Sequence, residues 1–196
     1  MSTTTVRFTL AIVACLASPA NAAIGIFSTP DGSNCNATLP PFTPTSIYVL
    51  YLGQGGPMAN GAEYRIAGMP GTFGVTFTAT LTQAPGSNLN LGNGFDGVGH
   101  NVAWPAVQPF DANGNLLLAT YTLTVLGSPV PEGTVLSIEA RVPQCMVVPW
   151  CGEALITDGD FNLIIQTRGH MRVNGGPACT VGVREGTWTE IRSLYR

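Results

Sequence analysis

The chain has 196 residues, with eight basic and eleven acidic side chains and a formal net charge of -3. All the basic residues are arginines scattered along the sequence, so there is no basic cluster to neutralise nucleic-acid phosphates or to dock on an anionic membrane surface. Hydrophobic residues make up 45% of the chain, which excludes an intrinsically disordered protein, and the length fits one domain.

Residues 1–22 have the pattern of a secretory signal peptide. Arg7 precedes an apolar run at residues 8–17, and Ala20 and Ala22 occupy the two positions that a signal peptidase reads. We therefore expect cleavage after Ala22 and a single mature domain at residues 23–196. In an alternative interpretation residues 12–15 are a lipobox, and Cys15 carries a lipid.

The expected location follows from this segment. Its apolar run is about half of the ~20 residues needed to span a bilayer, and no later run comes close, so no transmembrane segment is expected. The sequence predicts a protein that is secreted or held at the cell surface, with the periplasm as a further possibility.

The mature chain retains four cysteines, which are Cys35, Cys145, Cys151 and Cys179. An even number in an oxidising compartment predicts two disulfides, with three connectivities open. Cys145 and Cys151 bracket a short segment that contains Pro149, so we favour a bond between these two and a second bond between Cys35 and Cys179. No pair has the short spacing of a zinc site, and no structural metal is expected.

The rest of the mature chain is predicted to be almost entirely β-strand. Short runs rich in β-forming residues lie between Gly, Pro and Asn turns, at residues 23–27, 46–52, 62–67, 74–83, 116–126, 134–142, 154–157, 162–167, 170–173 and 180–184. The clearest is 119–126, in which apolar residues alternate mainly with Thr. Residues 84–111 are rich in Gly, Asn and Pro and predict a long loop with one embedded strand.

Strands at this spacing favour a two-sheet antiparallel β-sandwich of the immunoglobulin-like or jelly-roll kind. Only the C-terminus predicts a helix: a short one at residues 187–195, with Thr187 as its cap and Trp188 against the sheet. A second interpretation of residues 187–196 is a docking or sorting tag.

No catalytic motif is present. His100 and His170 lack a nucleophile context and there is no Gly-x-Ser-x-Gly elbow, so both are expected to be surface or hydrogen-bonded structural histidines. A glycosidase would need two converging carboxylates, and the candidates are Glu63, Asp96, Glu139, Glu153, Asp158 and Asp160. The favoured interpretation places Glu63 and Glu139 on outward strand positions and Asp158 and Asp160 beside a turn.

Two kinds of binding residue remain as candidates. Trp150 and Trp104 could stack against a sugar, and Trp150 is the better one for exposure, although burial is the commoner fate of tryptophan. Asp158 and Asp160 are candidate calcium ligands at an edge of the sandwich. Residues 111–115 resemble the start of a calcium loop but depart from its spacing, and they predict a hairpin turn instead. No cofactor is expected.

Two sequence stretches carry a family resemblance. Residues 46–49 followed by residues 61–66 resemble exported bacterial β-sandwich modules of the cohesin-like and immunoglobulin-like kind. Residues 174–177 with 179–183, and the closing segment 187–196, are similar to secreted bacterial proteins that have no assigned activity. The resemblance implies a cohesin-like sandwich. It supports the fold rather than a partner, since no cohesin contact residue can be mapped onto this chain.

The function that these observations predict is a non-enzymatic extracellular module, structural or adhesive, with an unknown protein or glycan partner. The alternatives are a glycan-binding module that uses exposed aromatic residues and a secreted hydrolase built on carboxylates.

Overall fold

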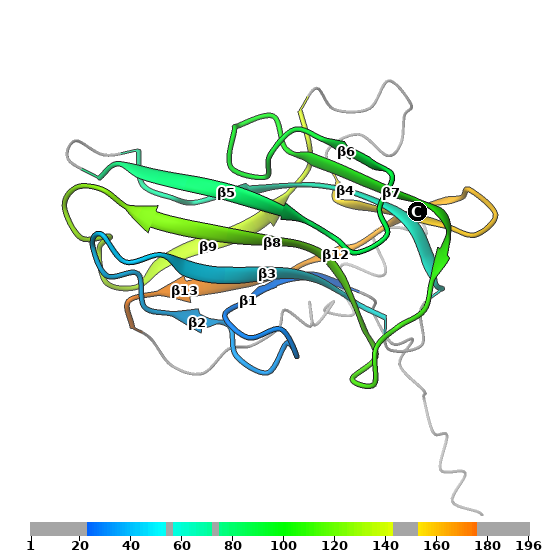
Figure 1. Cartoon of the computed structure of the whole chain (residues 1–196), viewed down its shortest axis with the longest axis horizontal. Coiled ribbons are helices and arrows are strands. Elements are labelled where there is room, and N and C mark those ends of the chain that lie inside the picture. Colours follow the sequence, from blue (N-terminus) through cyan, green and yellow to red (C-terminus); the bar gives the residue numbers. More distant parts are fainter. Residues whose placement is uncertain (1–22, 54–56, 72–74, 143–152, 176–196) are drawn as a thin grey trace, which may run out of the picture.

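The computed structural model describes residues 23–53, 57–71, 75–142 and 153–175. Within these ranges the chain is all-β and contains thirteen strands arranged in two sheets (Figure 1). No helix long and apolar enough to cross a membrane is found there. Several predicted features lie outside the described residues and are not tested by the structure. They are the signal peptide, the strand at 180–184, the C-terminal helix, Trp150 and the cysteines other than Cys35.

The first sheet contains the strand with the clearest sequence pattern. Its described strands lie in the order β12 (Thr167–Arg168), β1 (Ala23–Phe27), β3 (Thr45–Leu52), β8 (Asn115–Val125) and β5 (Phe77–Gln83). Along the second half of β8, Tyr121, Leu123 and Val125 are buried while the Thr residues between them are half-buried. The alternation predicted for this segment is therefore confirmed, because successive side chains of a strand point to opposite faces.

The second sheet is larger and has a branched order. One path runs through β11 (Leu163–Ile165), β10 (Leu155–Asp158), β4 (Ala59–Ala67), β9 (Thr134–Glu139), β13 (His170–Val173) and β2 (Asn36–Ala37). β4 also pairs with β7 (His100–Gln108), and β7 pairs with β6 (Leu89–Leu91). Residues 59–63 of β4 are thus flanked by β7 and β10, so this part of β4 lies inside the sheet.

One hydrophobic core joins the inner faces of the two sheets. The first sheet contributes Ile26, Ile47 and Leu123, and the second contributes Ile66 and Ile138, all almost completely buried. Burial of apolar side chains between two sheets is the main stabilising contribution in a sandwich of this kind. The predicted all-β sandwich is therefore confirmed for the described residues.

Among the named strands of the described residues, the pairing departs from a purely antiparallel arrangement at two places. β12 runs parallel to β1, and β2 runs parallel to β13. Cys35, which is 2% exposed, immediately precedes β2, and its carbonyl oxygen accepts a hydrogen bond from the Arg172 amide. The disulfide pairing of Cys35 stays a prediction.

The prediction of one embedded strand in residues 84–111 is wrong. This segment forms both β6 and the nine-residue β7. β7 was not predicted from the sequence because it contains Pro105, and proline cannot donate a hydrogen bond to a strand ladder. In the structure Pro105 lies where the register of β7 against β4 shifts, in a bulge that needs no such bond.

The strand predicted at 162–167 is divided between the two sheets. β11 pairs with β10 in the second sheet, whereas β12 pairs with β1 in the first. Gln166 lies at the crossing, is 2% exposed, and donates its backbone amide to the carbonyl of Ala154. The chain then returns at Gly169, where a Cβ would come within 2.7 Å of the Gly25 Cα, so only glycine fits this close crossing.

Candidate functional site

Five strands of the second sheet, in the order β6, β7, β4, β10 and β11, present two aligned rows of side chains to the outside of the sandwich. We call this surface the outer face. The first row is Leu91, Asn101, Glu63, Leu155 and Ile165, each directly opposite the next. The second row is Leu89, Ala103, Gly61, Thr157 and Leu163.

The row between these two points inward, which fixes the direction of the outer face. Val102, Ala62 and Ile156 occupy that middle row and are at most 3% exposed. Directly opposite residues of an antiparallel sheet share one face, so the two flanking rows point away from the core.

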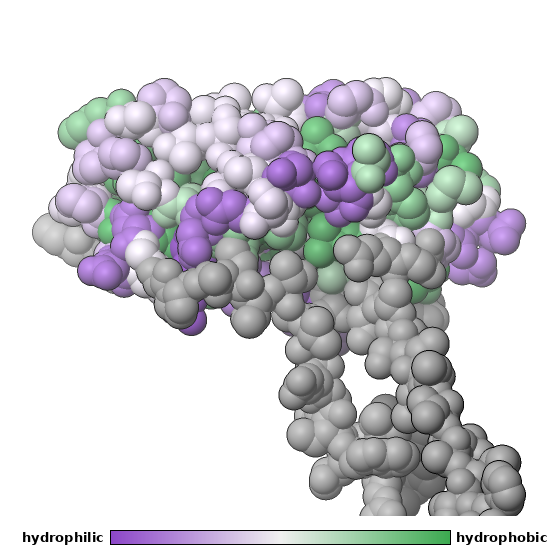
Figure 2. Space-filling model, turned by 90° about the horizontal axis from the view of Figure 1, so that it is seen from below, coloured by the Kyte–Doolittle hydropathy of each residue, from purple (hydrophilic) through white to green (hydrophobic). Residues whose placement is uncertain are grey.

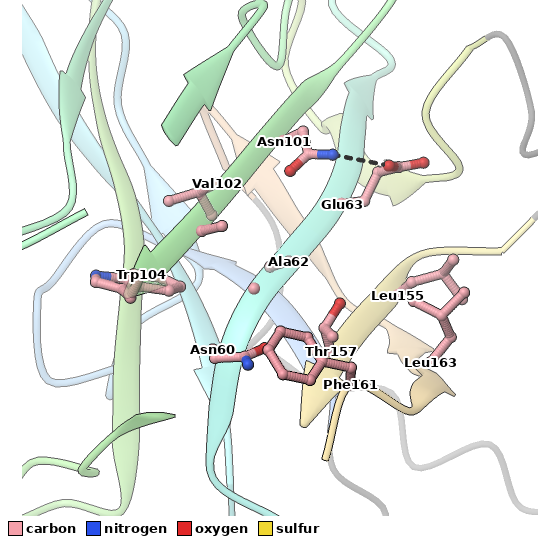
Figure 3. A pocket seen from close by; sticks show the side chains of 12 residues that line it. Asn60, Ala62, Glu63, Asn101, Val102, Trp104, Leu155, Thr157, Phe161 and Leu163 are labelled. Carbon is pink, nitrogen blue, oxygen red and sulfur yellow. Dashed lines mark hydrogen bonds between the residues drawn. The ribbon is translucent and has the colours of Figure 1, made fainter. Parts of the chain in front are cut away.

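The centre of the outer face is hollow. A cavity of about 260 Å³ lies over β7, β4 and β10. Small residues form its floor, since Gly61 and Ala103 lie opposite one another in the second row. Its walls include Trp104, Leu155, Phe161 and Leu163 (Figure 3).

One polar pair lies at the first row of this hollow. The Asn101 Nδ2 donates a hydrogen bond of 3.0 Å to Glu63 Oε2 across β7 and β4 (Figure 3). Among the described residues that line the hollow, Glu63 is the one that carries a charge. The prediction that Glu63 occupies an outward strand position is therefore confirmed.

The hairpin between β10 and β11 brings an aromatic ring to the hollow. Asp158 Oδ1 accepts hydrogen bonds from the backbone amides of Asp160 and Asn162, at 3.0 and 2.8 Å, which fixes the turn. Hydrogen bonds from the Asn162 side chain and then from these amides lower the pKa of Asp158. Phe161 takes a positive φ of 63° in this turn and is 78% exposed.

The other predicted carboxylates lie elsewhere. Glu139 is bonded to Arg65, and Glu153 pairs with Arg168 at 2.6 Å. Asp96 accepts hydrogen bonds from the amides of Val98 and Gly99 in the loop before β7. A glycosidase needs two carboxyl groups about 5 to 9.5 Å apart across one cleft, and only one carboxylate occurs among the described residues of the hollow. The hydrolase alternative is not supported.

The remaining candidates of the sequence analysis are placed as follows. Trp104 lines the hollow but is 5% exposed, and its Nε1 donates to the Pro85 carbonyl oxygen at 3.0 Å. Asp158 and Asp160 lie beside the hairpin turn, and no group of three or more metal-ligating side chains occurs in the described ranges. Residues 111–115 form a tight turn, but it connects β7 and β8 of different sheets and is not a β-hairpin.

A buried polar network lies behind the outer face, between the sheets. His100, Tyr64 and Tyr121 are all 0% exposed. The Tyr64 hydroxyl lies 3.0 Å from His100 Nδ1 and 3.2 Å from the Tyr121 hydroxyl. Burial raises the pKa of Tyr64 well above its usual range and that of Tyr121 to about 12, so both hydroxyls remain protonated.

The hydrogen bonds at the two ends of this network determine which atom donates and which accepts at each step. Asn90 Nδ2 donates to Ser87, which leaves its Oδ1 as the acceptor 3.3 Å from His100 Nε2. Nε2 therefore carries the proton, and Nδ1 accepts from Tyr64. At the other end the Gly94 amide donates to the Tyr121 oxygen at 3.1 Å.

Every hydroxyl in this network consequently donates once and accepts once: Tyr121 donates to Tyr64, and Tyr64 donates to His100. Burial lowers the pKa of His100 to about 4; Asp96 opposes this shift, and Arg141 adds to it. His100 is thus a neutral, hydrogen-bonded core residue, as expected of a structural histidine.

Most residues of the hollow were missed by the sequence analysis. Phe161, Asn101 and Leu163 carry no motif, and their common position depends on how β7, β4, β10 and β11 align. The one signal in the sequence was Phe161 between Asp160 and Asn162, an aromatic residue inside a turn.

No family model matches the chain, and no curated protein matches it significantly. Solved structures that are similar in fold include cohesin modules. One is the cohesin module of a family 33 glycoside hydrolase from Clostridium perfringens, with 13% identity, a TM-score of 0.43, and coverage of 79% of this chain and 97% of that one. A non-cellulosomal cohesin from the archaeon Archaeoglobus fulgidus has 12% identity, a TM-score of 0.42, and coverage of 80% and 93%.

A type I cohesin in complex with a dockerin, from Clostridium thermocellum, has 8% identity and a TM-score of 0.41, with coverage of 81% of this chain and 97% of that one. These overlaps are weak. The sandwich described above follows from the strand pairing and the core of this chain alone.

Proposed function

We propose that this protein is a non-enzymatic binding module of the cell exterior, and that its outer face is the surface that binds another protein. The observation that carries the proposal is the pair of aligned rows on the outer face. They place exposed apolar side chains at both margins, with Leu91 49% and Ile165 45% exposed, around a hollow with small residues at its floor, and the hairpin turn adds Phe161, which is 78% exposed.

Exposed apolar side chains that gather around a concave centre are typical of protein-interaction surfaces. Figure 2 shows one side of the molecule, seen from below, on which hydrophilic residues gather at the lower left, near the middle and at the right-hand end, with a hydrophobic area between the last two.

A protein ligand fits the hollow better than a free small molecule. Its volume of about 260 Å³ lies below the range of ~300 to 1,000 Å³ of sites that enclose a whole small ligand. Most of its lining residues are apolar, and its polar side chains lie in two places, Glu63 with Asn101 in the first row and Asn60 with Thr157 beside Phe161 (Figure 3).

Site-specific photo-crosslinking tests this proposal in cells that make the protein. We expect a photoreactive residue at position 161 or 91 to give a discrete crosslinked protein, and one at Thr80, on the outward side of β5 in the first sheet, to give none. Equal labelling from all three positions, or no product from the outer face, would contradict the proposal. Transfer to glycan alone would favour the glycan-binding alternative.

The extracellular location is part of the same proposal, and it is supported by the signal-peptide pattern of residues 1–22 and the even cysteine set. Mass spectrometry of the exported protein should give a chain that starts at Ala23 and has no free thiol. A chain that retains residues 1–22 or reacts with a thiol reagent before reduction would rule this location out.

A further inference from the structure

One carboxylate gives the hollow its charge. Glu63 is the one charged residue in the part of the lining that the structure describes. Its Oε2 accepts from Asn101, whereas its Oε1 makes no hydrogen bond within the described part of the chain. Within the described residues, one oxygen thus fixes the carboxylate in place, and the other is left for a donor from a partner.

The segments around the hollow add negative rather than positive charge. The hairpin strands and turn, residues 155–165, contain Asp158 and Asp160 and no basic residue. Arg65 points to the same face two residues beyond Glu63, but it is bonded to Glu139. An anionic ligand would meet repulsion here, and a cation would be attracted.

Apolar walls surround this charge. Leu155 lies directly opposite Glu63 in the first row, and Leu163 and Phe161 line the hollow from the neighbouring hairpin. Figure 3 shows the Phe161 ring over the floor between β4 and β10. A cation that fits must therefore bring an apolar stem, as lysine and arginine side chains do, and its head group can also contact the face of an exposed aromatic ring.

We propose that the hollow anchors one arginine or lysine side chain of the protein partner, with the aliphatic stem against Leu155, Leu163 and Phe161 and the cationic head on Glu63 Oε1. The inference rests on the proposed function of the outer face and adds the chemistry of its central contact. The volume suits one long side chain, and anchor residues in central pockets commonly dominate protein interfaces.

A titration with a minimal cationic probe tests the inference on the mature protein. The probe is N-acetylarginine methylamide, and the matched neutral probe is N-acetylcitrulline methylamide, which has nearly the same shape without the charge. We expect the arginine probe to shift the backbone amide signals of Gly61, Asn101 and Phe161, with a dissociation constant in the millimolar range, and high salt to weaken its binding. Citrulline should bind at least about threefold more weakly.

Two charge-neutralising variants complete the test. Glu63→Gln keeps an acceptor for Asn101 and should lower the affinity for the arginine probe about threefold to tenfold, to the level of citrulline. Glu132→Gln removes the same charge from an exposed turn outside the hollow and should leave the affinity unchanged.

Absence of shifts at ~100 mM probe, equal binding of the two probes, or an effect of Glu132→Gln as large as that of Glu63→Gln would overturn the inference. Crosslinking through the outer face together with no preference for arginine would leave the proposed function standing and remove this anchor alone.

Discussion

The buried hydrogen-bond network of His100, Tyr64 and Tyr121 predicts that the loss of one hydroxyl lowers the free energy of unfolding substantially. In Tyr64→Phe the ring still fills its place in the core, but His100 Nδ1 loses its donor and Tyr121 loses its acceptor. Each buried group left unsatisfied costs about 1 to 3 kcal/mol. We expect the free energy of unfolding to fall by roughly 3 kcal/mol, near the top of the usual range for single substitutions.

Urea unfolding of the oxidised protein, followed by circular dichroism, measures this change. With a denaturant slope of about 1 to 3 kcal/mol per molar, the midpoint should fall by ~1 to 3 M. Tyr48→Phe is the matched control, because the Tyr48 hydroxyl makes no hydrogen bond among the described residues and the side chain is half-buried on β3. A Tyr64→Phe midpoint within error of the Tyr48→Phe midpoint would refute the assignment of the network.

Two further predictions concern the same sheet. The pKa of His100 is about 4 in the folded chain and about 6.5 when unfolded, so the unfolded chain binds more protons between these values. The stabilisation is complete above pH 6.5 and is lost as the pH falls towards 4, by ~3 kcal/mol in all. A nitrogen-15 NMR titration should find the His100 ring neutral, with the proton on Nε2, until about pH 4, and a midpoint near 6.5 would contradict the prediction. Gly68→Ala should destabilise by about 3 kcal/mol or more, because Gly68 has a φ of 96° and a Cβ would collide with the Val135 carbonyl oxygen. Gly71→Ala, whose Cβ would meet no atom of the described residues within 4 Å, should stay within ~0.5 kcal/mol of wild type in the same urea assay.

The sandwich could be predicted because its strands carry local signals. Residues 119–125 alternate apolar residues with Thr, and the turn at Asp158 and Asp160 has the residues that bond their own backbone. β7 could not be found in this way, since the alternation of buried residues at His100, Val102 and Trp104 stops at Pro105. Its place in the sheet depends on pairing with β4, about forty residues away in the sequence, for which no local pattern exists.

The hollow could not be predicted from the sequence for a similar reason. Glu63 and Asn101 meet because Cα positions 63 and 101 are paired, and Leu155 reaches the same row through β10. A shift of one residue in either pairing would turn these side chains into the core. Glu63 was considered from its residue type alone, but only the register shows that it lies among apolar walls, with no second carboxylate among the described residues that line the hollow.

The double crossing at Gln166 and Gly169 has a mechanical consequence. Within a few residues the backbone hydrogen-bonds to the second sheet, then to the first, and then to the second again. The two sheets are therefore connected by main-chain hydrogen bonds as well as by the core between them. A load applied to one layer is passed directly to the other, so the layers should part in a single event, and slow amide exchange should disappear from both at the same denaturant concentration.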